Sequence, residues 1–295
     1  MVELIEQQIV RGDPRIAELD SELLAIFKEF GVDVERISPK IIDRLLLLDS
    51  KTETLRDCLN QVAIERKIFA NLPEGRLSFL EQATAVIGTI FSDIGKTGPA
   101  NATPDQQELI AEIFGEDNVF EPSQTTVKQF FKRYFPERAS EFINRFQTIQ
   151  DVIEVDDENN PGHKKLIKVW LDSGITMRQF FDMHTKWTLD IINHDGVPPE
   201  GVAAAATHHF AQGINPEGII GKDNTFKDGF GENKKFDLAE KLVAVMDQYD
   251  ARRRRAGLEH KEAVAGVKTY VEKSSFKGDS ESAELIDVLE PLDLN

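Results

Sequence analysis

The sequence predicts an all-α protein built as a helical bundle. Through most of the chain, apolar residues recur every three or four positions, which is the period of a helix with one buried face. Hydrophobic residues make up 40% of the 295 positions and charged residues 29%, as in ordinary globular proteins. A chain of this length can bury a large core, so we expect one large helical domain or one domain with an appendage.

The charge and the cysteine content limit the partners and the compartment. The formal net charge is −17, and such an acidic chain has no broad basic surface for binding DNA, RNA or anionic membranes. The single cysteine excludes an internal disulfide and fits a reducing compartment. The first residues are acidic and polar, and no run of about 18 apolar residues occurs, so neither a signal peptide nor a membrane span is expected. We expect a soluble, cytoplasmic protein.

Residues 1–50 are expected to form an N-terminal helical layer without chemistry of its own. The apolar positions of residues 14–30 lie on one face of a helix, and Gly31 is a residue type that ends helices. Pro39 then opens a second predicted helix that runs to Leu48.

Residues 51–295 are expected to form the main domain. Asp49 and Ser50 are expected to cap its first helix, which places Cys58 on an apolar stripe as a small core residue. The next helix, residues 77–91, is apolar on nearly all sides, so we expect it in the middle of the bundle.

The segment at about 99–165 is predicted to be a helical insertion in the main domain. Three helices are expected there, at 105–114, 125–135 and 137–149, with phenylalanines supplying most of their apolar surface. The acidic run at 154–158 is expected to be a solvated loop.

The second half of the chain contains all the candidate histidine ligands. A helix that begins at Thr176 places His184 on its buried stripe. His194 and Asp195 come ten residues after His184 and directly before a glycine and two prolines, so we expect them to serve a turn. Pro198 and Pro199 begin a further helix, whose alanine-rich run leads to two adjacent histidines.

The C-terminal part is predicted to hold a loop, a long helix and a short helix. Glycines interrupt residues 211–231, which suits the wall or lid of a site. Asp237 is expected to cap the long helix, and the arginines at 252–255 near its end are either a solvated run or the phosphate-facing edge of a pocket. The short helix is expected near 283–289.

The adjacent histidines, His208 and His209, are the first candidate site. Neighbouring side chains on a helix point about 100° apart, so both serve one site only where several helices converge; otherwise they are a packing or capping pair. Asp93 ends a buried helix, where the helix macrodipole disfavours a carboxylate unless a cation lies nearby. Lys96 or a metal ion, or both, could be that cation, and the alternative is a solvated carboxylate in a loop.

Taken in order, Asp93, His184, the pair His208-His209 and Asp247 resemble the HD superfamily of metal-dependent phosphohydrolases, and within it the HD-GYP cyclic dinucleotide phosphodiesterases. The resemblance covers roughly residues 51–292. It is carried by three stretches: Ser92-Asp93-Ile94-Gly95-Lys96, similar to the family's His-Asp-Ile-Gly-Lys; His184-Thr185-Lys186; and Asp247-Gln248-Tyr249-Asp250-Ala251, similar to its closing Asp-x-x-Asp-Ala. The resemblance implies an HD-type helical bundle.

The chain departs from the family at defined positions. Cys58 stands where the family has its first histidine, and Ser92 stands where it has the histidine of the HD pair. After His209 the family continues with a glutamate and a Gly-Tyr-Pro signature, whereas residues 210–216 contain neither the glutamate nor the tyrosine.

By this resemblance the metal ligands are Asp93, His184, His208, His209 and Asp247. The three histidines and Asp93 match one ion, a set suited to iron, manganese or zinc, whereas the second ion depends on the positions of Ser92 and Asp247. Asp93 and Lys96 match the catalytic groups, with Lys96 orienting or neutralising phosphate.

We therefore expect a degenerate HD-GYP-like domain that binds one divalent transition metal ion. It would be weak or inactive as a cyclic dinucleotide phosphodiesterase, acting as a nucleotide sensor or an interaction module. The alternative is an active phosphohydrolase that uses the one retained ion on another phosphoester. A third interpretation is a helical scaffold whose histidines are relics. The partners implied are a cyclic dinucleotide or another phosphoester, and a protein partner or a second copy of the chain.

Overall fold

The computed structural model describes residues 19–116, 118–156, 164–193, 196–254 and 256–294. Within these ranges it contains twelve α-helices, several short 3-10 turns and two antiparallel hairpins, so the predicted, mostly helical fold is confirmed. None of the helices in these ranges is long and apolar enough to cross a membrane.

In chain order the helices are α1 (Ser21–Glu29), α2 (Pro39–Lys51), α3 (Thr54–Asn71), α4 (Phe79–Phe91), α5 (Pro104–Phe114), α6 (Val127–Tyr134), α7 (Ala139–Phe146), α8 (Met177–Ile192), α9 (Pro199–Thr207), α10 (Leu238–Arg254), α11 (His260–Lys273) and α12 (Ser280–Leu289). The strands are β1 (Gln150–Asp156) with β2 (Lys164–Trp170), and β3 (Thr225–Phe230) with β4 (Asn233–Lys235).

Two boundaries at the N-terminal end differ from the prediction. The first helix begins at Ser21, where the Asp20 side chain accepts a hydrogen bond from the Glu22 amide at 2.7 Å; the predicted start at residue 14 lies outside the described residues. The prediction that Asp49 and Ser50 cap α3 is wrong, because both lie inside α2, which continues to Lys51.

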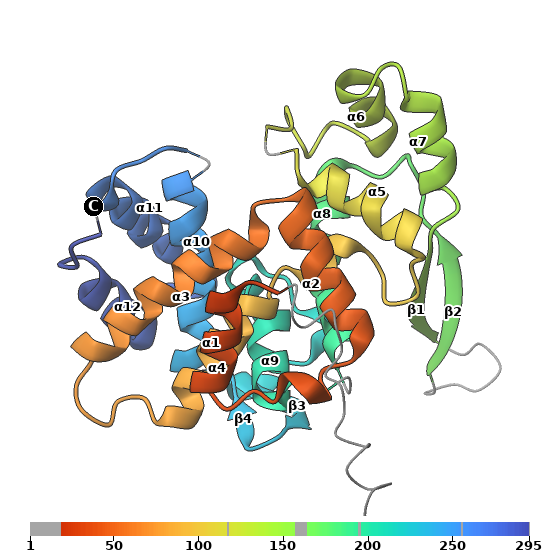
Figure 1. Ribbon diagram of the computed structural model, residues 1–295. Helices are drawn as coiled ribbons and strands as arrows, with labels where there is room; N and C mark the ends of the chain where they lie inside the picture. The colour runs from red at the N-terminus through yellow and green to blue at the C-terminus, as the bar shows by residue number, and fades with distance from the viewer. Residues whose placement is uncertain (1–18, 117, 157–163, 194–195, 255, 295) are drawn as a thin grey trace, which may run out of the picture.

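The centre of the molecule is the packing of α4 against α9, α10 and α3 (Figure 1). As predicted, α4 is deeply buried, and every residue from Ala83 to Phe91 is removed from solvent. A Cβ atom at Gly88 would lie 2.5 Å from the Cβ of Ala204, so only small residues allow α4 and α9 to approach this closely. This close packing brings the C-terminal ends of α4 and α9 to the same place.

The insertion contains β-structure that the sequence reading did not predict. Helices α5, α6 and α7 lie at the expected positions, but residues 150–156 and 164–170 form an antiparallel hairpin in which Ile153 pairs with Ile167 (Figure 1). The acidic run is therefore not simply a loop, since 154–156 belong to β1 and 157–158 lie outside the described residues. Val152, Ile153 and Val155 favour an extended chain, which explains the strand.

The C-terminal region contains one helix more than predicted. Segment 211–231 consists of short 3-10 turns and strand β3, and α10 begins directly after Asp237 as expected. Helix α11 was not predicted, although its buried residues recur at helical spacing: His260, Ala263, Val264, Val267 and Val271. The predicted short helix near 283–289 is α12.

Candidate metal centre

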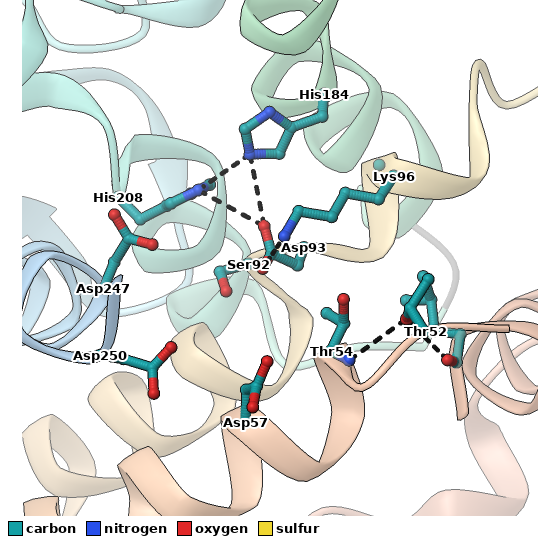
Figure 2. A network of polar contacts seen from close by, with 12 residues as sticks. Thr52, Thr54, Asp57, Ser92, Asp93, Lys96, His184, His208, Asp247 and Asp250 are labelled. Carbon is teal, nitrogen blue, oxygen red and sulfur yellow. Dashed lines mark hydrogen bonds and ion pairs between the residues drawn. The ribbon is translucent and has the colours of Figure 1, made fainter. Parts of the chain in front are cut away.

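Three imidazoles converge where α8 meets the end of α9. His184 comes from the middle of α8, and His208 and His209 directly follow α9. One ring nitrogen from each of the three lies within 4.8 Å of the others (Figure 2 shows His184 and His208). His184 and His208 are buried and His209 is partly buried, so the cluster is an interior feature rather than a surface group.

The adjacent histidines face one space because the helix ends between them. Helix α9 stops at Thr207, His208 keeps helical angles as its C-cap, and His209 turns to φ −99° and ψ 12°. Their ring centroids are consequently only 4.2 Å apart. The requirement set by the sequence, that the pair can share a site only where helices converge, is met in this geometry.

The hydrogen bonds of His184 and His208 define which nitrogen each ring offers. The Nδ1 atom of His184 lies against the carbonyl oxygen of Phe181, and that of His208 is 2.7 Å from the carbonyl oxygen of Ala205. A carbonyl only accepts, so in each neutral ring Nδ1 carries the proton and Nε2 carries a lone pair. These two Nε2 atoms lie 3.1 Å apart.

Burial keeps both rings neutral. It lowers the pKa of His208 to about 4 and that of His184 well below its usual value, and the neighbouring imidazoles add to both shifts. Neutral imidazole is the form that binds metal ions, so this pair is ready to coordinate an ion at neutral pH.

Asp93, directly after the C-cap of α4, adds a carboxylate to the cluster. Its Oδ1 atom lies 3.4 Å from Nε2 of His184 and 4.0 Å from Nε2 of His208, and its Oδ2 atom accepts a hydrogen bond from the Lys96 ammonium at 2.6 Å (Figure 2). Burial raises the pKa of Asp93, but the charge of Lys96 is the main opposing influence, and this pKa lies well below its usual range. Lys96 therefore supplies the cation that the sequence required at this helix end.

A glycine positions the turn that carries Asp93 and Lys96. A Cβ atom at Gly95 would lie 1.9 Å from the carbonyl oxygen of His184, so the turn can approach α8 this closely only with glycine. The Gly95 amide donates to the Thr188 hydroxyl at 3.1 Å, and this hydroxyl donates to the carbonyl of Ser92 at 2.8 Å.

A buried arginine fixes the other end of the same turn. The guanidinium of Arg44, from α2, donates to the carbonyl oxygens of Thr97 at 3.2 Å, Gly98 at 3.0 Å and Pro99 at 2.8 Å. Arg44 is only 2% exposed, and burial lowers its pKa to about 10. The turn between α4 and α5 is thus held by a charged group that is satisfied by backbone oxygens.

His209 and Asp247 form the rim of the cluster. Nε2 of His209 lies 3.5 Å from a carboxylate oxygen of Asp247, which comes from α10. Nδ1 of His209 is buried and has no hydrogen-bond partner among the described residues. A buried ring nitrogen without a partner is unusual and suits a position where a ligand completes the group.

The donor set fits a transition metal ion. Ligand nitrogens that bind one ion at about 2.0–2.1 Å lie about 3 Å apart, which matches the separation of the His184 and His208 Nε2 atoms. Imidazoles joined by one carboxylate suit iron, manganese or zinc, and the geometry does not choose between these.

A cavity of about 530 Å³ opens beside the cluster. Its lining includes the polar residues of the cluster: Asp93, Lys96, His184, His209 and Asp247. The lining also includes Phe114, Phe181, Arg178, Gln212 and Tyr270. A ligand of tens of atoms could therefore contact an ion held by the histidines.

Ser92 and Cys58, which the sequence comparison matched to family histidines, have other contacts. Ser92 donates its hydroxyl to the carbonyl of Thr89 at 2.9 Å, within its own helix. Cys58 is buried, as predicted, and burial together with Asp93 raises the pKa of its thiol well above the usual value. His194 and Asp195 lie outside the described residues.

Two further carboxylates lie near the site: Asp57, which the sequence analysis did not single out, and Asp250, which it named in the closing motif without a role. Asp57 in α3 is 7% exposed, and Asp250 in α10 faces it across the space beside Ser92 (Figure 2). The sequence pattern could have pointed to Asp57, because the polar residues Asp57, Gln61 and Glu65 recur every four residues and so share one face of α3. In the structure all three are buried.

The arginines near the end of α10 are not a uniformly solvated run. Arg254 pairs with Asp57, Arg253 donates to the carbonyl of Leu258 at 2.8 Å, and Arg252 lies over the Tyr270 ring. Arg255 lies outside the described residues.

Comparison with known proteins assigns no family. No family model matches the chain, and searches of characterised proteins and of solved structures found no match either.

Proposed function

We propose that this chain is a metal-binding domain of the HD type that has kept one ion site and lost ligands for a second. The observation that carries the proposal is the pair of lone-pair nitrogens of His184 and His208, 3.1 Å apart, with Asp93 and His209 beside them. Two lone pairs at this distance repel each other unless a cation or a proton lies between them. The order of the ligands along the chain, and a mostly helical fold that brings them together, support the HD type.

The same residues favour binding over efficient catalysis. Two metal ions stabilise both the attacking and the leaving oxygen of a phosphodiester. By the resemblance, a second ion would depend on the positions of Ser92 and Asp247, and Ser92 offers a hydroxyl where the family has an imidazole. We therefore propose a domain that is weak or inactive toward cyclic dinucleotides and serves as a nucleotide sensor or an interaction module.

One observation favours the alternative, a phosphohydrolase that works with one ion. Asp93 and Lys96 line the same cavity as His184 and His209, so a phosphoester bound there would meet a carboxylate, an ammonium group and the ion together. A bound ion would polarise the phosphate, and Lys96 would neutralise part of its charge.

The test begins with metal content and ends with turnover. Purified protein loaded with iron, manganese or zinc should hold one ion per chain, and His208→Ala should lose it. The loaded protein is then incubated with cyclic di-GMP and with nitrophenyl phosphoesters. Binding without turnover supports the proposal, whereas hydrolysis that Asp93→Ala abolishes supports the enzyme. Asp190→Ala, which removes an α8 carboxylate paired with Lys186, is the matched control.

A further inference from the structure

The cavity beside the imidazole cluster has aromatic side chains next to a metal ligand. Phe114, at the end of α5, and Phe181, in α8, both line the cavity, and both are partly buried. Their ring centroids lie 5.3 Å apart, and the centroid of Phe114 lies 5.9 Å from that of His184 in an edge-on arrangement. A group bound to an ion at His184 would therefore have a phenylalanine ring beside it.

The insertion supplies much of the apolar lining. Val119 and Pro122 line the same cavity as Phe114, and all three belong to the segment at about 99–165. Most of the other lining residues are polar or charged, so the phenylalanines stand out as an apolar contact for a ligand. The volume of about 530 Å³ lies within the range of about 300–1,000 Å³ that is typical of pockets for small organic molecules.

Tyr270, from α11, adds a hydroxyl to the lining of this cavity. Its oxygen is buried and has no hydrogen-bond partner among the described residues, while the side-chain oxygen of Gln212 accepts a hydrogen bond from Arg178 at 2.7 Å. Burial and the charge of Asp247 raise the pKa of this phenol more than Gln212 lowers it, so the hydroxyl remains a donor. A buried donor without a partner suits a position where an oxygen of a ligand completes the group.

We propose that the cavity binds a phosphoryl group that carries one flat aromatic ring, with the ring in contact with Phe114 and Phe181. The phosphoryl oxygens would contact the ion and the Lys96 ammonium, and the Tyr270 hydroxyl would donate to one of them. Aromatic rings prefer offset or edge-on contacts with other rings, and these contacts stabilise beyond the apolar area that they bury. The inference rests on the proposed function, because the ion at the imidazoles holds the phosphoryl group.

The charges of the lining make this binding depend on the ion. Lys96 pairs with Asp93, and Arg178 pairs with Asp182, so both cations that line the cavity already have a carboxylate partner. Glu116 and Asp247 line it as well, so the side chains alone give an anion little net attraction. The ion supplies the positive charge, and the phosphoryl group is therefore expected to bind only the metal-loaded protein.

The competing explanation is that Phe114 and Phe181 only complete the edge of the core. Phe135 provides the matched comparison, because it is another partly buried phenylalanine of the insertion and its ring packs on Phe131 and Phe142 rather than beside His184. If the rings serve packing alone, Phe114→Leu and Phe135→Leu should both leave the choice between ligands unchanged.

The experiment measures the dissociation constants of three phosphonates by isothermal titration calorimetry with Mn²⁺-loaded protein. Phenylphosphonate and cyclohexylphosphonate have the same number of carbon atoms, but only the phenyl ring is flat and aromatic, and methylphosphonate has no ring. Phenylphosphonate is expected to bind about fivefold more tightly than cyclohexylphosphonate, with methylphosphonate the weakest. Phe114→Leu should remove the preference for the phenyl ring, whereas Phe135→Leu should keep it.

Tyr270→Phe tests the hydroxyl separately from the aromatic contact. This variant should weaken the binding of all three phosphonates by about tenfold, because each carries the oxygens to which the hydroxyl donates. Tyr134→Phe is the control, since the Tyr134 hydroxyl donates to the Asn118 carbonyl at 2.9 Å, and its affinities should equal those of the wild type. Unchanged affinities in Tyr270→Phe would remove this residue from the site.

The outcomes separate this inference from the proposed function. Protein that binds Mn²⁺ but does not prefer phenylphosphonate over cyclohexylphosphonate would overturn the inference and leave the metal site standing. Phenylphosphonate binding that persists in EDTA and still requires Phe114 would support the aromatic contact and contradict the role of the ion. If Phe114→Leu does not fold, as judged by circular dichroism, Phe181→Leu replaces it with the same expected loss of preference.

Discussion

Nε2 of His184 and Nε2 of His208 face each other at 3.1 Å, and each ring is held in this position by a hydrogen bond from Nδ1 to a carbonyl three residues earlier. The backbone carbonyls of Phe181 and Ala205 therefore orient the two imidazoles. The partial repulsion between the lone pairs is a free-energy term that a bound cation would remove, so binding and folding should be coupled.

Metal binding should stabilise the fold through His208. At a free Mn²⁺ concentration of 100 times the dissociation constant, the free energy of unfolding should rise by about 2.7 kcal/mol, and EDTA should reverse the change. His208→Ala should abolish the response, measured as the shift in melting temperature. His260→Ala is the control, since His260 is also buried but bonds to Tyr249. An unchanged metal response in His208→Ala would contradict the assignment.

Gly95→Ala should disrupt the site without touching a ligand. Its new methyl group would lie 1.9 Å from the His184 carbonyl, so the turn carrying Asp93 must move away from α8. We expect a loss of stability of about 3 kcal/mol, at the upper end of overpacking effects, and weaker Mn²⁺ binding. Gly115→Ala, whose nearest neighbours would be 3.5 Å away, should change stability by no more than about 0.5 kcal/mol. Chemical denaturation measures the stability of both variants, and metal titration measures their Mn²⁺ affinity. Equal losses in Gly95→Ala and Gly115→Ala would refute the packing argument.

Glu65→Gln should stabilise the protein at alkaline pH. Glu65 is fully buried, accepts one hydrogen bond from Thr89, and has its other oxygen without a partner among the described residues. Burial raises its pKa from 4.5 to about 7, so between these values the folded state keeps a proton that the unfolded state has released. Stability should therefore fall as the pH rises through this window, by about 3 kcal/mol from this group.

The measurement for Glu65 is the difference in unfolding free energy between Glu65→Gln and the wild type at pH 4.5 and pH 8. The gain from the substitution should be small at the lower pH and approach about 3 kcal/mol at the higher. A difference that does not depend on pH would show that Glu65 is not protonated in the folded protein.

Acid should destabilise the metal-free protein through His208. In the unfolded chain this histidine takes up a proton near its usual value of 6.5, whereas burial lowers its folded pKa to about 4. The full contribution of His208 to the free energy of unfolding is therefore present above pH 6.5. As the pH falls toward 4, this contribution decreases by about 3 kcal/mol. Denaturation in EDTA across this range should be less steep for His208→Ala than for the wild type, and identical slopes would argue against a neutral buried ring.

The helical fold could be predicted because its helices are long and strongly periodic. The sequence locates α4 by its apolar composition and α8 by the stripe that contains His184. The hairpin of β1 and β2 was missed because its alternation is short and partly acidic, and α11 because alanines and valines give a weak pattern. The local sequence pattern predicts the structure of a single segment, whereas the hairpin and α11 are stabilised by contacts with neighbouring segments.

The imidazole cluster could be anticipated from the order of its residues, but the contacts that build it could not. The approach of Gly95 to α8, the clamp of Arg44 on residues 97–100 and the pairing of Arg254 with Asp57 all join positions far apart in the chain. The sequence around each of these residues does not indicate which distant residue it contacts. These contacts are determined by the tertiary packing.

The most direct test of a metal centre at these histidines is anomalous X-ray scattering from crystals of the protein grown with Mn²⁺ or Zn²⁺. We predict one strong anomalous peak per chain, at about 2.0–2.2 Å from Nε2 of His184 and Nε2 of His208, with Asp93 in contact. A map with no peak between these nitrogens at saturating metal, in crystals that otherwise reproduce the fold, would contradict the account.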